Sequence, residues 1–394
     1  MNLALDSKLI TLLVLGSIAL FFFPLLFLFA SILVLTASEI NKSLAFSIIG
    51  GGLALFFTLI NLLKVPESDM LVYIDAIREI RGYSFFDVIQ FNFVSMRSIE
   101  FIFNYYIYFV SFIDTGGFFF SFLSVFIIYI LFALSLDKVM PLELREKYLI
   151  FFSLILFSIT FSLSGHLVRQ YLAASVLIYG IASFKDSPVK GGLFILMSPF
   201  VHISVAPFVV LIPLLYKSLS RKAWVLISVF SVLIALAMTS FVVVLRPYME
   251  IGFVKDDGSI PVFLIVFDAI LFFGFVCVRV LKTECFEKTK VVYCFALLLV
   301  CCLIVSHEIN LIFLRYYFLM DFVRAVFLMY LIYFFSTKID FSRIVSFLVF
   351  TVCCLLFVYR LDSSPWDYGA TALEILFLTD VKAYAERIGM VWGV

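Results

Sequence analysis

The sequence predicts an all-α fold, a polytopic bundle of transmembrane helices. Hydrophobic residues occupy 64% of the 394 positions and charged residues only 14%. The mean hydropathy of +1.19 lies far above the range of soluble globular proteins. The formal charge of +1 provides no basic field that would recruit nucleic acid. We therefore expect one integral membrane domain over residues 1–394 and no nucleic-acid partner.

Apolar runs of about 20 residues, the length that crosses a bilayer, recur along the whole chain. They predict about ten crossings, at residues 9–37, 43–63, 117–136, 148–164, 167–184, 223–245, 261–281, 291–306, 316–335 and 344–361. The first run is too long for a signal-peptide core and should stay as a helix that bends at Pro24.

The polar connections between these runs are of two kinds. Short loops rich in Lys and Arg cover residues 137–147, 185–190, 217–222, 282–290 and 338–343, and longer segments of mixed charge cover residues 64–98, 246–260 and 362–394. The positive-inside rule assigns the basic loops to the cytoplasm and the mixed segments to the outside. This assignment makes 64–98 an external amphipathic loop and 362–394 an external C-terminal tail, and it places both termini outside.

One apolar run, residues 193–216, breaks the alternation because it joins two basic loops that both belong in the cytoplasm. The run must therefore turn back instead of crossing once. Pro199 and Pro207 bracket His202 in its middle, and prolines interrupt helices. We expect a broken or re-entrant helix pair here, with its irregular backbone covered by protein or water.

The external segment 64–98 should contain an amphipathic helix. Ile74, Ile77 and Ile80 recur at helical spacing among charged residues, a pattern typical of a helix lying on a surface. The aromatic stretch 98–113, around Glu100, should not cross the membrane on its own, because a crossing there would reverse the sidedness of every later loop.

No soluble catalytic signature occurs in the chain: it has no phosphate-binding glycine loop and no Cys-x-x-Cys metal spacing. His166, His202 and His307 are the three histidines, so a three-His metal site would need all of them, and the ligand sets usually seen in proteins make such a site a minor alternative. The seven cysteines lie almost entirely in apolar runs, which favours reduced thiols. We expect neither a metal nor a cofactor.

The most informative segment begins the run 167–184, where Arg169 lies at the outer mouth of a predicted helix. His166 and Gln170 flank Arg169, and the free backbone N–H groups of a helix start favour an anion. Ala173 and Gly180 share the face of Arg169 and should pack closely against another helix. An arginine in this place suits a phosphate or diphosphate, although an arginine that only anchors the helix in lipid headgroups would look similar.

These residues resemble the EpsG-like branch of the Wzy-type polysaccharide polymerases, bacterial inner-membrane enzymes that join lipid-linked oligosaccharide repeat units. The similarity extends over about 61–324, and the residues that carry it are Arg169, Gln170, Ala173, Tyr179, Gly180, His202, Ser204, Asp69, Tyr73, Glu100 and Arg315. The chain departs from the family pattern at Lys64, where an arginine is usual, and at Phe101, where a proline is usual.

The resemblance implies a membrane glycosyltransferase that polymerises undecaprenyl-diphosphate-linked units into O-antigen, capsule or exopolysaccharide on the outer face of the inner membrane. Its partners would be that lipid-linked oligosaccharide, membrane lipid and a chain-length regulator. The residues implied as catalytic bases are Asp69, Glu100, His166 and His202. The residues implied in substrate binding are Arg169, Gln170, Tyr73 and Arg315.

Other interpretations stay open at this point. A lipid-linked oligosaccharide flippase or transporter also uses broken helices and intramembrane charges, and a glycan ligase or a membrane acyltransferase also places Arg and His at helix ends. Asp69 and Glu100 could simply be solvated, and His202 could only cap a helix end. Asp321 and Arg324, at i and i+3, are expected to form a structural ion pair. Asp268 stands alone in its helix and could line a cavity.

Overall fold

A computed structural model gives the fold of most of the chain. It describes residues 24–25, 28–30, 42–93, 98–141, 148–158, 164–212, 221–245, 262–281, 289–306, 310–336, 342–364 and 366–393. Throughout these ranges the regular elements are helices, which confirms the predicted all-α class. The predicted first crossing, 9–37, lies almost entirely outside the described residues.

The chain packs into two compact units. Unit 1 comprises residues 1–133, 144–168 and 343–394, and unit 2 comprises residues 134–143 and 169–342. Each unit therefore combines segments that are distant in sequence.

Unit 1 is built around α3 (Lys42–Leu62), which packs against α7 (Tyr148–Ser158). The ring of Phe57 on α3 stacks on Tyr129 of α6 (Phe118–Val139), with 4.2 Å between ring centroids. The remaining elements of unit 1 are α4 (Asp69–Ile80), η1 (Asp87–Gln90), η2 (Ser98–Glu100), α5 (Phe101–Ser111), α18 (Ser342–Asp362), η7 (Glu374–Leu378) and α19 (Val381–Trp392).

The predicted amphipathic helix in 64–98 is confirmed as α4. Its face containing Tyr73, Ile74 and Ile77 is buried, and the helix packs on α5. α5 has only 11 residues, about 16 Å of helix, so it is too short to cross a bilayer alone, as expected. The outer location of both helices stays a prediction.

The described residues of the C-terminal segment 362–394 pack onto the rest of unit 1. The external location of this segment stays a prediction. Asp380 caps α19 by accepting a hydrogen bond from the Ala383 N–H at 2.7 Å. The Trp392 indole N–H donates to the Leu62 carbonyl at 2.8 Å, and the Tyr384 hydroxyl donates to the Leu59 carbonyl. These donors satisfy carbonyls in the last turn of α3 that have no partner within a helix.

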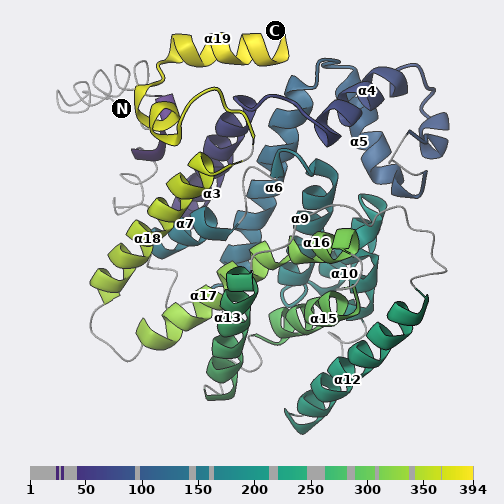
Figure 1. Cartoon of the computed structure of the whole chain (residues 1–394), viewed down its shortest axis with the longest axis vertical. Coiled ribbons are helices and arrows are strands. Elements are labelled where there is room, and N and C mark those ends of the chain that lie inside the picture. The colour runs from purple at the N-terminus through teal and green to yellow at the C-terminus, as the bar shows by residue number, and fades with distance from the viewer. Residues whose placement is uncertain are drawn as a thin grey trace, which may run out of the picture. The chain divides into compact units, whose positions relative to one another are not determined.

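Unit 2 contains two pairs of adjacent helices (Figure 1). α12 (Arg221–Leu245) packs on α15 (Lys290–Ser306), and α13 (Val262–Leu281) packs on α17 (Met320–Ser336). The other helices of unit 2 are α9 (Val168–Ser183), α10 (Pro188–Met197), η4 (Ser198–Phe200), η5 (Ile203–Val210) and α16 (Asn310–Tyr317).

The small face predicted on the arginine helix is confirmed in α9. Ala173 is fully buried, and Gly180 lies so close to α10 that a Cβ there would approach the Ile195 nitrogen to 2.9 Å. From the other side, a Cβ on Gly191 would lie 2.6 Å from the Phe184 Cα. Glycine at both positions lets the two backbones touch.

The predicted break in run 193–216 is also confirmed. Helix α10 ends at Met197, η4 follows, and His202 adopts an extended conformation (φ −158°, ψ 127°) before η5 begins. η5 packs against both η4 and α10, so the helix is interrupted at the histidine. That the run turns back to the side it came from stays a prediction.

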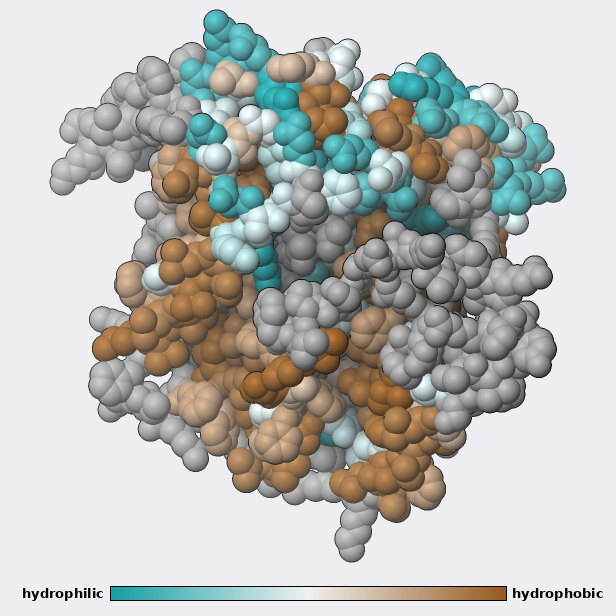
Figure 2. Space-filling model, viewed as in Figure 1, coloured by the Kyte–Doolittle hydropathy of each residue, from teal (hydrophilic) through white to brown (hydrophobic). Residues whose placement is uncertain are grey.

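The described residues contain three helices long and apolar enough to cross a membrane, Phe118–Val139, Ile312–Phe335 and Ile344–Asp362. Ile49–Leu62, Ala223–Thr239 and Lys290–Ser306 are apolar but shorter. The count of about ten crossings therefore stays a prediction. Within unit 1, hydrophilic surface gathers over α4 and α19, whereas the surface along α18 is hydrophobic (Figure 2).

Candidate functional site

The predicted site residues fall into two groups, one in each unit. Unit 2 holds Arg169, Gln170, His202 and Arg315, and unit 1 holds Asp69, Tyr73, Glu100 and His166. His166 and Arg169 are nevertheless close in sequence, with only two residues between them.

In unit 2 a hydrogen bond joins the two predicted arginine helices. The Gln170 side-chain amide donates to the Arg315 backbone carbonyl at 2.7 Å, which places the first turn of α9 against α16. Arg169 is only 6% exposed and Arg315 is half-buried. Because Arg169 is the second residue of α9, its side chain belongs to a helix start whose backbone N–H groups and dipole favour an anion.

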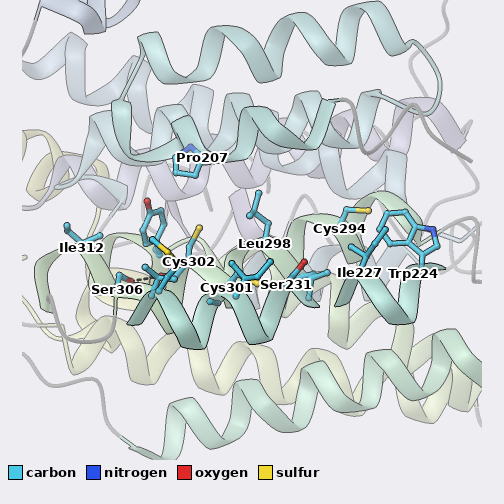
Figure 3. Close-up of a pocket in the computed structure, with 16 residues that line it drawn as sticks. Pro207, Trp224, Ile227, Ser231, Cys294, Leu298, Cys301, Cys302, Ser306 and Ile312 are labelled. Carbon is cyan, nitrogen blue, oxygen red and sulfur yellow. Dashed lines mark hydrogen bonds between the residues drawn. The ribbon is translucent and has the colours of Figure 1, made fainter. Parts of the chain in front are cut away.

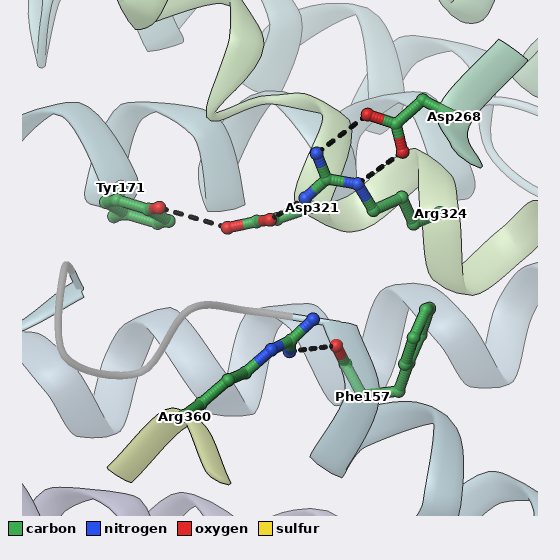
Figure 4. A network of polar contacts seen from close by, with 6 residues as sticks. All are labelled: Phe157, Tyr171, Asp268, Asp321, Arg324 and Arg360. Atoms are coloured by element: carbon green, nitrogen blue, oxygen red, sulfur yellow. Dashed lines mark hydrogen bonds and ion pairs between the residues drawn. The ribbon is translucent and has the colours of Figure 1, made fainter. Parts of the chain in front are cut away.

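A buried ion network contacts α9 through Tyr171, the fourth residue of that helix (Figure 4). The Tyr171 hydroxyl donates to Asp321 at 3.1 Å, and Arg324 donates to Asp321 at 2.5 Å, which confirms the predicted i, i+3 pair. Arg324 also donates to both carboxylate oxygens of Asp268, at 2.6 and 2.8 Å.

Asp268, which stands alone in its own helix, is paired across helices, because α13 packs on α17 and brings its carboxylate to the Arg324 guanidinium. Bidentate pairing of this kind is geometrically specific. The network therefore fixes α9, α13 and α17 relative to one another through Tyr171.

His202 is 5% exposed at the break between η4 and η5. Its side chain makes no capping hydrogen bond to η5, so capping does not account for a histidine at this position. The same segment approaches α16, since the ring of Phe208 on η5 lies 6.3 Å from that of Tyr316.

In unit 1 three segments meet around Trp366. The ring of His166 lies 3.9 Å from the Trp366 ring between centroids, and the Lys64 ammonium lies 4.5 Å from that ring. The backbone of Val65 donates to the Asp367 carbonyl at 3.0 Å, which holds the residues after α18 beside the end of α3. We call Lys64, His166 and Trp366 the lysine–histidine cluster.

Burial shifts both titratable groups of this cluster toward their neutral forms. Lys64 is 3% exposed, and burial lowers its pKa to about 7, with the nearby Glu67 acting in the opposite direction. Burial and the charge of Lys64 together lower the pKa of His166 to about 4. At neutral pH the imidazole is therefore uncharged and Lys64 is balanced between its two forms, so either group has the protonation state that a proton acceptor needs.

The other predicted residues of unit 1 differ in how they are buried. Glu100 is 1% exposed just before α5, so the idea that it is merely solvated is wrong. Asp69 is half-buried as the first residue of α4. Tyr73 is 3% exposed, and its ring packs 5.7 Å from Phe103 and 5.6 Å from Phe120. The structure thus gives Tyr73 a core-packing position, and its role in substrate binding stays a prediction.

Sequence reasoning missed Trp366 and gave Lys64 too little weight. Trp366 lies in a segment that the charge pattern classed as an external tail, and no local motif marks it. Lys64 did carry a signal, since it occupies the place of a cation that is usual in the resembling family.

A sequence model of the EpsG family matches residues 48–368 of this chain. The chain belongs to the EpsG family. The match includes both arginine helices of unit 2 and, in unit 1, the complete lysine–histidine cluster. Membership makes this chain a membrane protein and associates it with polysaccharide biosynthesis. Comparisons with curated proteins and with solved structures found no match.

The six described cysteines of this EpsG-family protein are free thiols, as expected. Cys285 and His307 lie outside the described residues. The roles predicted for the arginines and histidines stay predictions, and the structure adds the lysine–histidine cluster and the ion network to the candidate residues.

Proposed function

We propose that this EpsG-family protein is a membrane glycosyltransferase that polymerises undecaprenyl-diphosphate-linked oligosaccharide units on the outer face of a bacterial inner membrane. The observation that carries the proposal is the 2.7 Å hydrogen bond from Gln170 to the Arg315 carbonyl. It holds two arginine-bearing helix ends together, and two guanidinium groups suit the oxygens of one diphosphate.

In the proposed reaction a hydroxyl oxygen of the acceptor glycan forms a bond to the anomeric carbon of the donor glycan. The bond from that carbon to the diphosphate oxygen breaks, and the lipid diphosphate leaves with the electron pair. Arg169 and Arg315 stabilise the charge that develops on the leaving group. The scheme needs no metal ion or cofactor of its own.

The proton of the attacking hydroxyl passes to a base of this chain. Asp69, Glu100, His166 and His202 are the bases that we propose from sequence, and Lys64 joins them on the grounds of its burial. A general base contributes about 10²–10⁴-fold to a rate. Alanine in place of the residue that acts as base should therefore abolish polymer without reducing the amount of protein in the membrane.

The proposal is tested by the length distribution of glycans in cells that lack this chain. A polymerase predicts the loss of polymer while single repeat units remain on the outer side. Accumulation of lipid-linked units on the cytoplasmic side would instead identify a flippase and contradict the proposal. Normal polymers that are no longer transferred to their final acceptor would identify a ligase.

A further inference from the structure

Unit 2 contains an apolar groove between α12 and α15 that α16 and η5 help to form (Figure 3). The groove has a volume of about 500 Å³, within the range of small-molecule sites. We call this cavity the α12–α15 groove.

The lining of the α12–α15 groove suits hydrocarbon rather than water or a polar headgroup. None of the described side chains that line it carries a charge, and aliphatic residues such as Ile227, Ala235 and Leu298 predominate. The hydroxyl of Ser306 donates to the Cys302 carbonyl at 2.7 Å, so it is already satisfied within its helix. Polar groups of a ligand would find few partners here, whereas an apolar chain would lose no hydrogen bond.

The groove is elongated along α15. Ile312 and Ser306 lie at one end and Trp224 and Cys294 at the other (Figure 3). Ser306 is 12 positions after Cys294, which at about 1.5 Å of rise per residue corresponds to about 18 Å of length. A cavity with these proportions fits a linear chain better than a compact molecule.

One end of the groove lies at α16, the helix that carries Arg315 of the candidate diphosphate site. Tyr316 lines the groove, and the preceding residue, Arg315, is held at its backbone by Gln170. Ile312, at the same end, is one helical turn before Arg315. A ligand with its anionic head at Arg169 and Arg315 can thus lay an apolar tail along α15.

We propose that the α12–α15 groove binds the isoprenoid chain of the lipid-linked substrate, next to its diphosphate. This assignment rests on the proposed function, which supplies a substrate with both an anionic head and a long hydrocarbon chain. The ordinary alternative is the acyl chain of any membrane phospholipid. The connection to two arginines favours the isoprenoid diphosphate, because a phospholipid offers a single phosphate.

Native cysteines provide a direct test in the purified, full-length protein. Cys301 and Cys302 line the groove, whereas Cys277 and Cys354, equally half-buried, lie elsewhere. The rate of N-ethylmaleimide labelling would be measured at each cysteine by peptide mass spectrometry, with and without undecaprenyl diphosphate. At a concentration ten times its Kd, the lipid should slow labelling of Cys301 and Cys302 about tenfold, because only the unoccupied protein reacts.

Labelling of Cys277 and Cys354 should not change, and dioleoyl phosphatidylglycerol at the same concentration should not protect the groove. Equal protection by the phospholipid would show a general lipid site and overturn the assignment. Equal slowing at all four cysteines would reflect micelle effects or a global change and would also overturn it.

A second experiment fills the groove. Ala235→Phe places a ring inside it, and Leu233→Phe is the matched control, because Leu233 is 54% exposed on the same helix and lies outside the lining. Ala235→Phe should abolish protection by undecaprenyl diphosphate and reduce polymer formation, while Leu233→Phe should behave as the wild type. Wild-type protection in Ala235→Phe would overturn the groove assignment and leave the polymerase proposal standing. Conversely, protection of the groove by undecaprenyl diphosphate together with a flippase phenotype in cells would support the groove assignment and contradict the polymerase proposal.

Discussion

Lys64 shows how strongly one buried side chain depends on its neighbours. A lysine with 3% exposure loses most of the hydration that stabilises its ammonium charge. The cation–π contact with the Trp366 ring compensates for only part of this lost stabilisation. The pKa falls to about 7 as a result. The charge of this residue therefore changes within the pH range in which bacteria live.

We predict a pH-dependent stability that belongs to Lys64. Its folded-state pKa of about 7 lies below the unfolded value near 10.5, so between these values the unfolded protein binds a proton that the folded protein does not. Below about pH 7 the folded protein bears the full free-energy cost of burying the charged ammonium. The free energy of unfolding therefore rises as the pH increases from about 7 to 10.5. In detergent, the melting temperature of the wild type should increase relative to that of Lys64→Met as the pH rises from 7 to 10.

The control for this experiment is Lys382→Met, because the Lys382 side chain is 80% exposed on α19. Its melting temperature should keep a constant offset from the wild type between pH 7 and pH 10. A constant offset for Lys64→Met as well would show that burial does not perturb this lysine.

For Arg169 and Arg315 we predict that a positive charge alone is insufficient for polymer formation. A guanidinium binds phosphate oxygens through a planar fork, whereas lysine supplies a point charge in a different place. Arg169→Lys and Arg315→Lys should each lose most polymer formation, and the alanine variants should lose it entirely, with each protein still abundant in the membrane. Wild-type polymer from both lysine variants would favour anchoring in lipid headgroups, which tolerates any long cationic side chain.

At the scale of helices, the α9–α10 contact determines how the arginine helix is held. Gly180 and Gly191 face each other so closely that the Gly191 carbonyl would lie 3.0 Å from a Cβ on Gly180. A side chain at this contact would have to be accommodated by a shift of α9 or α10, and Arg169 is on α9.

We predict that Gly191→Ala destabilises the protein by about 1–3 kcal/mol, the usual cost of overpacking, because its Cβ would meet the Phe184 backbone. Gly192→Ala is the matched control, since its Cβ would lie an ordinary 3.8 Å from the Phe184 ring. Thermal unfolding in detergent would measure both variants. Equal stability of the two would mean that α9 and α10 do not approach each other this closely.

At the scale of the whole chain, a reversal of run 193–216 at His202 would determine on which side of the membrane every later loop lies. We predict that the loops 185–190 and 217–222 both lie in the cytoplasm; Ser220, in the second loop, is outside the described residues. Cysteines introduced at Ser187 and at Ser220 should both resist an impermeant maleimide in intact cells and both react after lysis. Reaction of the Ser220 position alone in intact cells would mean that run 193–216 crosses the membrane.

The sequence was informative wherever a local pattern decides the structure. Proline positions and loop charges predicted the break near His202, helical spacing predicted α4, and a helix start with small residues on one face predicted the setting of Arg169. Each of these inferences uses residues within a few turns of one another.

The missed features depend on residues that are far apart in the sequence. Asp268 and Arg324 are 56 positions apart, and only the packing of α13 on α17 brings them together. Trp366 meets Lys64 from the far end of the chain, and in a protein with 51 Phe and 19 Tyr one more aromatic residue carries no signal. Periodicity and charge identify which helices form, but not which side chains meet between them.

The hydrogen bonds that complete the end of α3 have a consequence for the order of assembly. Their donors, Tyr384 and Trp392, are made 325 and 330 positions later than the carbonyls that accept them. During synthesis α3 is complete long before these donors exist, so other hydrogen-bond donors, such as water, must satisfy its last carbonyls in the interval. Unit 1 can reach its final packing only after α19 has been translated. A chain truncated before α19 should still enter the membrane but should not reach the final packing of unit 1.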